Sequence, residues 1–221
     1  EGNSNPEHDL PFHNVTHTEG VIRRTALLLR AMRAEERTIQ LGRLAAAFHD
    51  TVQLWEPNPG PDGKVMRKRF AGRNEEESAA EAVTWMRQYL SIFTREDKVL
   101  VTKAIMATVP GWDPEAKTVY QPNLKADSHP IVRAVALADL GTGGIDGRDF
   151  AKEGDPLFRE ENLDIAAAIR NAKTHSDIST DQQETYKGRM LGWSRSQAGF
   201  VRGRKQRLEL ELGNLDTVLK T

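Results

Sequence analysis

The segment IQLGRLAAAFHD (residues 39–50) indicates the fold class. Its apolar residues recur at helical intervals and define the buried face of an amphipathic helix that ends in the polar pair His49-Asp50. The preceding segment, from Asn14 to about Leu29, repeats the pattern. The sequence contains no long alternating stretch typical of a β-strand and no internal repeat. We therefore predict an all-α fold in which amphipathic helices pack around one apolar core.

Turn-forming residues divide the rest of the chain into further helices and two irregular stretches. Residues 56–72 and 110–128 are rich in proline or other turn formers, which predicts loops. Further helices are predicted at 74–90, from 95 to just before Pro110, at 130–140, from Asp155-Pro156 onward and from about 181 to 212.

Capping residues mark several of these helix starts. Thr94 and Thr180 are suited to cap helices, and the spacing from Asn74 to Glu77 is close to a capping box. Glycines at 188, 192, 199 and 203 leave open whether the last segment is one helix or two.

Length and charge favour one globular domain. At about 150 residues per domain, the 221 residues predict a single unit after an extended lead-in over residues 1–12. The 31 Lys and Arg residues balance 32 Asp and Glu residues, so no overall field attracts nucleic acid, and we expect no nucleic-acid partner. No apolar run approaches the roughly 18 residues of a membrane span, so we expect no membrane association. The oligomeric state is not indicated.

The absence of cysteine limits the chemistry. Thiolate nucleophiles and thiolate metal sites are excluded, so any metal must bind to His, Asp and Glu. Together with the lack of a visible signal segment, it favours a cytoplasmic location.

Histidine and aspartate recur at helix positions that should be buried. His13 and His17 are four residues apart and share a helix face, His49-Asp50 ends an apolar helix, and Asp139 lies among Ala, Val and Leu. Burying such groups without partners costs several kcal/mol, and a divalent cation would compensate them. The alternative is that the histidines are satisfied core residues and the aspartates cap backbone groups.

Taken together, these residues resemble a known signature. His17, then His49-Asp50, then Asp139 is similar to the H…HD…D pattern of the HD-domain superfamily of metal-dependent phosphohydrolases. The resemblance covers about residues 12–145. It implies a helical bundle of HD type over residues 13–221, with a metal-site core at 13–145 and a long C-terminal helical extension at 155–212.

The resemblance also implies residue roles. His17, His49, Asp50 and Asp139 would be metal ligands, with Asp50 able to bridge to a second ion. The run His13-Asn14-x-x-His17 resembles the HNxxH motif of the cyclic-nucleotide phosphodiesterase branch, which would make His13 the general acid, so His13 and Asp50 are the expected catalytic residues.

The expected cofactor is one divalent metal ion, namely Mn²⁺, Mg²⁺, Co²⁺, Fe²⁺, Ni²⁺ or Zn²⁺, with a second ion left open. Histidine-rich two-metal members of the superfamily carry further histidines shortly after the HD pair, and here none occurs before His129. This departure argues against an oxygenase-type di-iron site.

Several residues are candidates for substrate binding. Arg69 and Arg73 supply cationic donors for a phosphate, and Glu77 resembles an acid near the nucleophilic water, although a capping role also explains it. Seven bases between 187 and 207, without an acid among them, predict a solvated face, and Arg189 among them could instead reach the pocket. Trp55, Trp112 and Tyr120 either stack on a base or anchor the irregular stretches to the core.

These observations predict a metal-dependent phosphohydrolase, with the HNxxH run favouring a phosphodiesterase, that uses a metal-activated water on a nucleotide or related small phosphoester. One alternative is a 5′-nucleotidase-like phosphomonoesterase in which His13 is structural. The other is a non-catalytic regulatory module that binds a nucleotide or metal.

Overall fold

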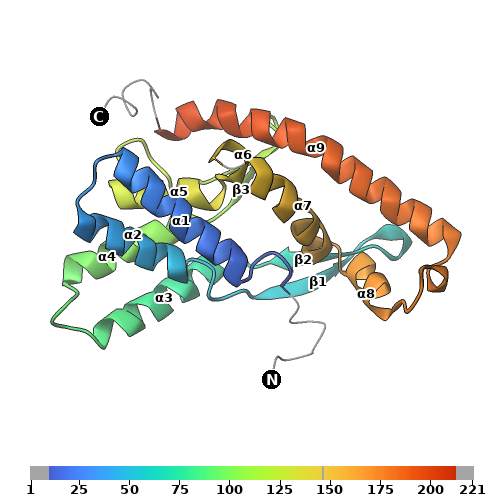
Figure 1. Cartoon of the computed structure of the whole chain (residues 1–221), viewed down its shortest axis with the longest axis horizontal. Helices are drawn as coiled ribbons and strands as arrows, with labels where there is room; N and C mark the ends of the chain where they lie inside the picture. Colours follow the sequence, from blue (N-terminus) through green and yellow to red (C-terminus); the bar gives the residue numbers. More distant parts are fainter. Residues whose placement is uncertain (1–9, 146, 213–221) are drawn as a thin grey trace.

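A computed structural model describes residues 10–145 and 147–212, so most of the predicted lead-in (residues 1–9) lies outside the described part. The described residues are mostly helical, which confirms the all-α character in its coarse form (Figure 1). The helices are α1 (Val15–Ala31), α2 (Glu36–Phe48), α3 (Arg73–Arg87), α4 (Arg95–Met106), α5 (Pro130–Asp139), α6 (Thr142–Ile145), α7 (Gly147–Glu161), α8 (Leu163–Asn171) and α9 (Thr180–Leu212).

Both stretches predicted as loops instead contain a short antiparallel hairpin, so that prediction was wrong. β1 (Trp55–Pro59) pairs with β2 (Val65–Arg69), and β3 (Gly111–Asp113) pairs with β4 (Thr118–Tyr120). The strands are short and β1 contains two prolines, which an edge strand tolerates because one side of it makes no ladder hydrogen bonds. Composition alone therefore concealed them.

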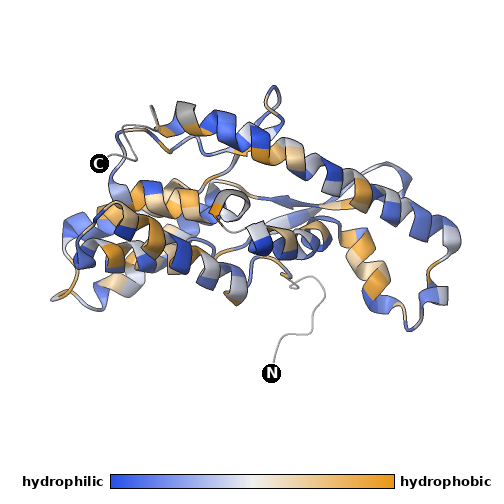
Figure 2. Cartoon of the chain, turned by 45° about the horizontal axis from the view of Figure 1, so that its top comes forward, coloured by the Kyte–Doolittle hydropathy of each residue, from blue (hydrophilic) through white to orange (hydrophobic). Residues whose placement is uncertain are grey.

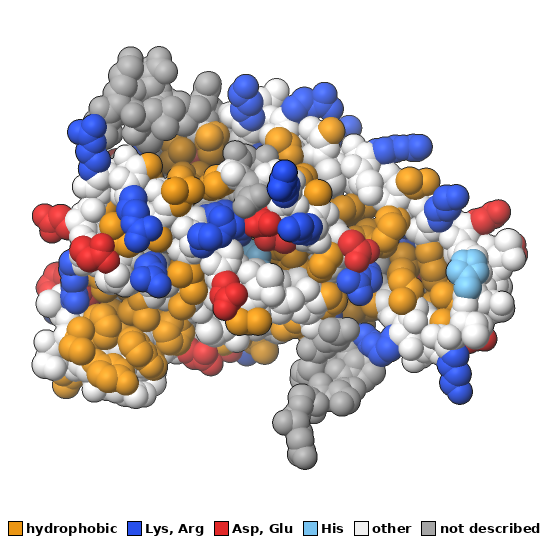
Figure 3. Space-filling model, in the orientation of Figure 1, with side chains coloured by type: hydrophobic (Ala, Val, Ile, Leu, Met, Phe, Trp, Pro, Cys, Tyr) orange, Lys and Arg blue, Asp and Glu red, His pale blue; other side chains and the backbone are white. Residues whose placement is uncertain are grey.

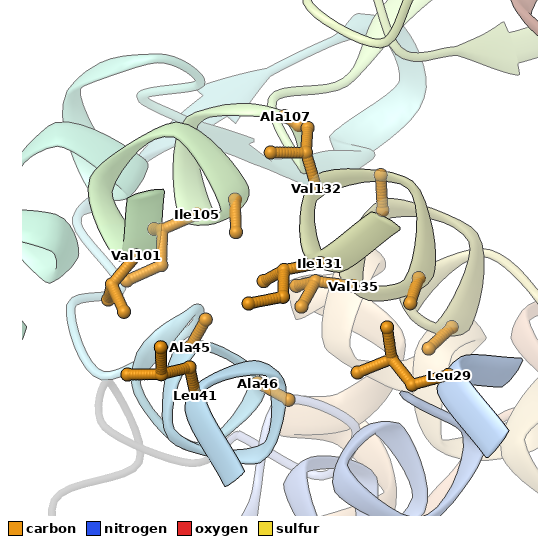
Figure 4. Packing of buried hydrophobic residues seen from close by; sticks show 14 of the residues in the cluster. Leu29, Leu41, Ala45, Ala46, Val101, Ile105, Ala107, Ile131, Val132 and Val135 are labelled. Carbon is orange, nitrogen blue, oxygen red and sulfur yellow. The ribbon is translucent and has the colours of Figure 1, made fainter. Parts of the chain in front are cut away.

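The core lies where α1, α2, α4 and α5 meet. Figure 4 shows Leu29, Leu41, Ile105 and Ile131 converging from these four helices. Small residues let the helices approach closely: a Cβ built on Gly42 of α2 would lie 2.5 Å from Leu29 Cδ1 of α1. This close packing brings the C-terminal ends of α2 and α5 beside the start of α1.

Local capping fixes several helix starts, in part as predicted. Asn14 Oδ1 accepts hydrogen bonds from the backbone N–H groups of Thr16 and His17, and Thr94 caps α4. The Asn74–Glu77 capping box is wrong, because α3 begins one residue earlier and its Glu75 carboxylate accepts from the Gly72 N–H. Gly72 has φ of 88°, a conformation that glycine adopts without strain.

The predicted helix start at Asp155-Pro156 is also wrong, because α7 begins at Gly147 and continues through Pro156. Proline removes one helical hydrogen bond. The turn that follows it is anchored instead by tertiary packing, with Phe158 only 2 % exposed and its ring 5.8 Å from that of Trp193.

The C-terminal segment is one helix, α9, which lies along one side of the molecule over α6, α7 and the β3–β4 hairpin (Figure 1). Figure 2 shows mostly hydrophilic residues along α9, in contrast to the hydrophobic α5. Its contact with the hairpin is close, because a Cβ on Gly203 would lie 2.6 Å from the Ala116 carbonyl oxygen. The Thr118 hydroxyl donates to the Phe200 carbonyl at 3.0 Å. The hairpin thus positions α9.

The prediction that the basic residues of α9 form a solvated face holds only in part. Three of them form ion pairs with acids elsewhere in the fold or on the same helix, namely Arg189 with Asp164, Arg204 with Glu211 and Arg207 with Asp113. On the face drawn in Figure 3, positive and negative side chains are intermingled. Within residues 10–145 and 147–212, no helix is long and apolar enough to cross a membrane. The division into a metal-site core and an extension stays a prediction.

Candidate metal site

Four predicted ligands converge from three helices. His17 lies in the first turn of α1, His49 and Asp50 directly follow α2, and Asp139 is the last residue of α5. One donor atom from each lies within 4.8 Å of all the others. His17 Nε2 is 3.5 Å from both Asp50 Oδ2 and Asp139 Oδ1. Ligand atoms held about 2.1 Å from one tetrahedral ion lie about 3.4 Å apart, so these separations suit a shared metal.

The histidine nitrogens are prepared to act as ligands. His49 Nδ1 donates to the Ala46 carbonyl at 2.7 Å, which leaves the lone pair on Nε2, the nitrogen that faces Asp50 at 3.1 Å. Among the described residues, the buried Nε2 atoms of His17 and His49 have no hydrogen-bond partner that satisfies normal geometry. Buried imidazole nitrogens without a partner are costly, and a cation between them and the carboxylates removes that cost.

The electrostatics of the four groups depend on one another. Burial disfavours both ionised carboxylates, but the charge of His49 holds the pKa of Asp50 well below its ordinary value, and the nearby imidazoles of His17 and His49, at 3.5 and 3.6 Å, lower the pKa of Asp139. Burial also disfavours the charged imidazoles, yet the two carboxylates raise the pKa of both histidines. A divalent cation would take the place of those protons, so binding is expected to release protons.

His13 lies beside this cluster, with Nε2 4.0 Å from Asp50 Oδ2. Arg69 Nη1 lies 2.9 Å from the same nitrogen, and because a guanidinium only donates, Nε2 accepts. Nδ1 then carries the proton and donates to Glu160 Oε1. Burial, followed by the charge of Arg69, lowers the pKa of His13. Nε2 must therefore receive a proton before it can deliver one.

Glu160, near the end of α7, is a site residue that the sequence did not indicate. Its side chain is buried, and Oε2 accepts the backbone N–H groups of Phe12 at 2.8 Å and His13 at 3.0 Å. Burial opposes its ionisation, but the hydrogen bond from the His13 ring outweighs burial and lowers the pKa of Glu160. It is 147 residues from His13 in the chain, so no local motif could connect them.

Arg24 contacts the residue before Asp139 and was also missed. Its side chain is fully buried, and Nε donates to the Ala138 carbonyl at 2.8 Å, directly before the candidate ligand Asp139. Nη1 lies 3.6 Å from Glu153 Oε1 of α7. Arg24 follows His17 by two helical turns, which puts both on one face of α1. This arginine therefore fixes the end of α5 that presents Asp139.

The predicted substrate-binding residues lie in different places. Arg69 lies at the cluster, with Nη2 3.6 Å from Asp50 Oδ1. Arg73 and Glu77 form an exposed ion pair with each other at 2.7 Å, without a described contact to the cluster. The acid of α3 that feels the charges of Asp50 and Arg69 is the buried Glu75, whose pKa is raised by burial.

Arg189 is held by structural partners. Its guanidinium donates to Asp164 at 2.6 Å and to Asn162, which ties α9 to α8 and the residue before it. Its role in the structure is thus an interhelical ion pair. His129 caps α5, with Nδ1 accepting from the Ile131 N–H, as expected for a residue outside the metal site.

A cavity of about 760 Å³ borders the metal cluster at Asp139. Phe12 also borders it, and the Phe12 ring lies 4.5 Å from the ring of His17. The far walls come from α7, α9 and the β3–β4 hairpin. Of the four candidate ligands, Asp139 is the one that lines this cavity.

Comparison of the chain with protein-family models, curated proteins and solved structures found no significant match.

Proposed function

We propose that the chain is a metal-dependent phosphohydrolase of the HD-domain type that hydrolyses a phosphodiester of a nucleotide or a related small phosphoester. The observation that carries the proposal is the convergence of His17, His49, Asp50 and Asp139 from three helices, with imidazole nitrogens that lack protein partners. Nitrogen and carboxylate oxygen donors suit first-row divalent ions.

The chain's own residues have complementary tasks. A divalent ion held by the four ligands would supply Lewis acidity and an acidic water. Arg69, whose guanidinium reaches both His13 and Asp50, is positioned to hold phosphate oxygens. In the hydrolysis, water adds to phosphorus and gives up a proton to His13 Nε2, the ester P–O bond breaks, and Nε2 passes that proton to the leaving oxygen. Glu160 keeps the ring of His13 in place.

A phosphomonoesterase is the second candidate, and one observation favours it. Nε2 of His13 accepts a hydrogen bond from Arg69 and so presents no proton to a leaving group in this arrangement. The variant His13→Ala discriminates between the two candidates. If His13 is the general acid, this variant should lose much more turnover with an alkyl leaving group than with 4-nitrophenolate. Equal losses on both favour a structural His13.

The first test of the proposal is metal content by plasma mass spectrometry on protein purified without chelator or affinity nickel. We expect about one ion per chain, lost in Asp139→Ala and retained in the exposed control Asp127→Ala, and Mn²⁺-dependent hydrolysis of bis(4-nitrophenyl) phosphate. About two ions would favour a binuclear site. Metal binding without hydrolysis of any phosphoester favours the regulatory module, and no uptake of Mn²⁺ contradicts the metal site.

A further inference from the structure

We infer that the cavity beside Asp139 binds a flat, uncharged or cationic aromatic group of a substrate that carries a single phosphate. The part of this inference that concerns the attached phosphate rests on the proposed function. The part that concerns the aromatic group rests on the cavity itself.

The cavity and the candidate metal cluster share Asp139. Phe12 also lines the cavity, and its ring lies 4.5 Å from that of His17 and 4.7 Å from that of His13. A phosphate at the cluster would therefore leave the rest of the molecule facing the cavity. Its volume of about 760 Å³ falls within the roughly 300–1,000 Å³ of small-molecule sites.

Five aromatic side chains line the cavity, namely those of Phe12, Trp112, Phe150, Trp193 and Phe200. Phe150 and Phe200 are nearly parallel, with an angle of 8° between their rings, and Trp193 is held against Gly154, where a Cβ would lie 3.1 Å from the indole. Trp112 lines the same space and is 60 % exposed, an unusual state for a large aromatic residue in a folded chain. Stacking of bases on such surfaces tolerates any base, because every base has a π-face.

Two polar side chains of the wall are already engaged with the backbone. The Ser196 hydroxyl and the Gln197 amide both line the cavity, and both already donate to the Trp193 carbonyl. Recognition by stacking is therefore favoured over recognition by hydrogen bonds, and we expect broad tolerance among aromatic groups.

The charge of the lining limits the number of phosphates. The acids Asp139, Glu153 and Glu161 line the cavity, whereas Lys117 is its only basic residue among those described. Arg24 Nη1 lies 3.6 Å from Glu153 Oε1 and offsets part of that negative charge. A second phosphate reaching into the cavity would meet like charges. Positive charge for a phosphate would come from Arg69 and from a cation held by the four candidate ligands.

The test uses the full chain with its metal chelated, so that binding is measured apart from hydrolysis. The four tryptophans are at 55, 85, 112 and 193. In the double variant Trp55→Phe/Trp85→Phe, the tryptophan fluorescence comes from Trp112 and Trp193, which both line the cavity. We expect saturable quenching by adenosine and by 1-naphthol, none by ribose, and weaker binding of ATP than of adenosine.

Variants of cavity residues test whether the fluorescence quenching comes from binding in the cavity. Phe200→Ala, and separately the exposed Trp112→Ala, are expected to weaken adenosine binding at least tenfold. The matched control Tyr89→Ala, an exposed aromatic residue outside the cavity, should leave it unchanged. The Trp112→Ala variant guards against loss of folding in Phe200→Ala, because its side chain is not part of the core.

The outcomes separate the two hypotheses. If adenosine and 1-naphthol do not bind, the cavity inference is overturned while metal-dependent hydrolysis can still stand. If ATP binds more tightly than adenosine, the single-phosphate part is overturned. If aromatic groups bind but the metal-loaded chain hydrolyses no phosphoester, the proposed function fails and the aromatic site remains.

Discussion

Glu160, near the end of α7, accepts hydrogen bonds from both the ring and the backbone N–H of His13, at the start of α1. One carboxylate therefore fixes the position of the first residue of the candidate site. It also joins the C-terminal half of the chain to the metal cluster. The candidate site is consequently a property of the whole described chain and not only of the four-helix core.

Removing this carboxylate should destabilise the fold. Glu160→Ala leaves the Phe12 and His13 N–H groups without their acceptor in a buried place. We expect a loss of about 2–4 kcal/mol in the free energy of unfolding, measured by urea denaturation. Glu76→Ala, on the exposed face of α3, is the control and should change stability by less than about 0.5 kcal/mol. A loss for Glu160→Ala no larger than the control would contradict the role assigned to Glu160.

Metal binding should stabilise the folded chain through the cluster. Because an ion that binds only the native state stabilises it by about 2.7 kcal/mol at one hundred times its Kd, excess Mn²⁺ should raise the Tm of the wild type. Asp139→Asn keeps the shape of the side chain but loses its charge, and it should abolish the Mn²⁺-dependent rise in Tm. Differential scanning calorimetry with and without Mn²⁺ measures both. An equal rise in the variant would show that the ion binds elsewhere.

Two glycines of α9 should respond in opposite directions to alanine. At Gly188 nothing lies within 4 Å of the added Cβ, so Gly188→Ala should stabilise by about 0.5–1 kcal/mol through helix propensity. At Gly203 the same Cβ would lie 2.6 Å from the Ala116 carbonyl oxygen, a backbone atom that cannot rotate away. Gly203→Ala should therefore destabilise by about 1–3 kcal/mol. Thermal denaturation of the two variants measures both changes in stability. Stabilisation by both substitutions would argue against the docking of α9 on the β3–β4 hairpin.

The Asp164–Arg189 ion pair predicts a pH dependence of stability. Burial opposes ionisation of Asp164, but the hydrogen bond from Arg189 outweighs burial and lowers its pKa. A lowered pKa means that the contribution is complete above the ordinary value of about 3.9 and is lost as the pH falls through the folded-state pKa. Asp164→Asn should thus be less stable than the wild type by about 1–3 kcal/mol at pH 7.

The difference between Asp164→Asn and the wild type should shrink below about pH 4, as followed by urea denaturation across the pH range. The exposed Asp181→Asn variant serves as the control. A difference that stays constant from pH 7 to pH 3 would mean that the ion pair contributes nothing to stability.

Much of the helical framework could be predicted from the sequence because it depends on local chemistry. The apolar period of residues 39–50 predicted α2, and the same period predicted a helix from near Asn14, where the structure shows the Asn14 side chain capping α1. The metal-site residues were also indicated, because an ionisable residue on an apolar helix face is anomalous wherever that helix packs. The structure brings all four of them together.

Features that depend on contacts between distant segments were missed. The prolines of β1 hid a strand that exists because β2 pairs with it. Pro156 suggested a helix start, yet α7 continues past it, where Phe158 is packed. Arg73 and Glu77 had the right chemistry for a substrate, but they pair with each other at the surface.

The spacing of apolar residues was enough to predict the amphipathic helices, because it fixes which side chains share a helix face, and it placed histidine or aspartate on three of those faces. The contact of Glu160 with His13, the contact of Arg24 with the residue before Asp139, and the cavity beside the cluster appear only in the folded chain. The two contacts join residues 147 and 114 positions apart, and their energy depends on burial and charge that exist only after the helices have packed.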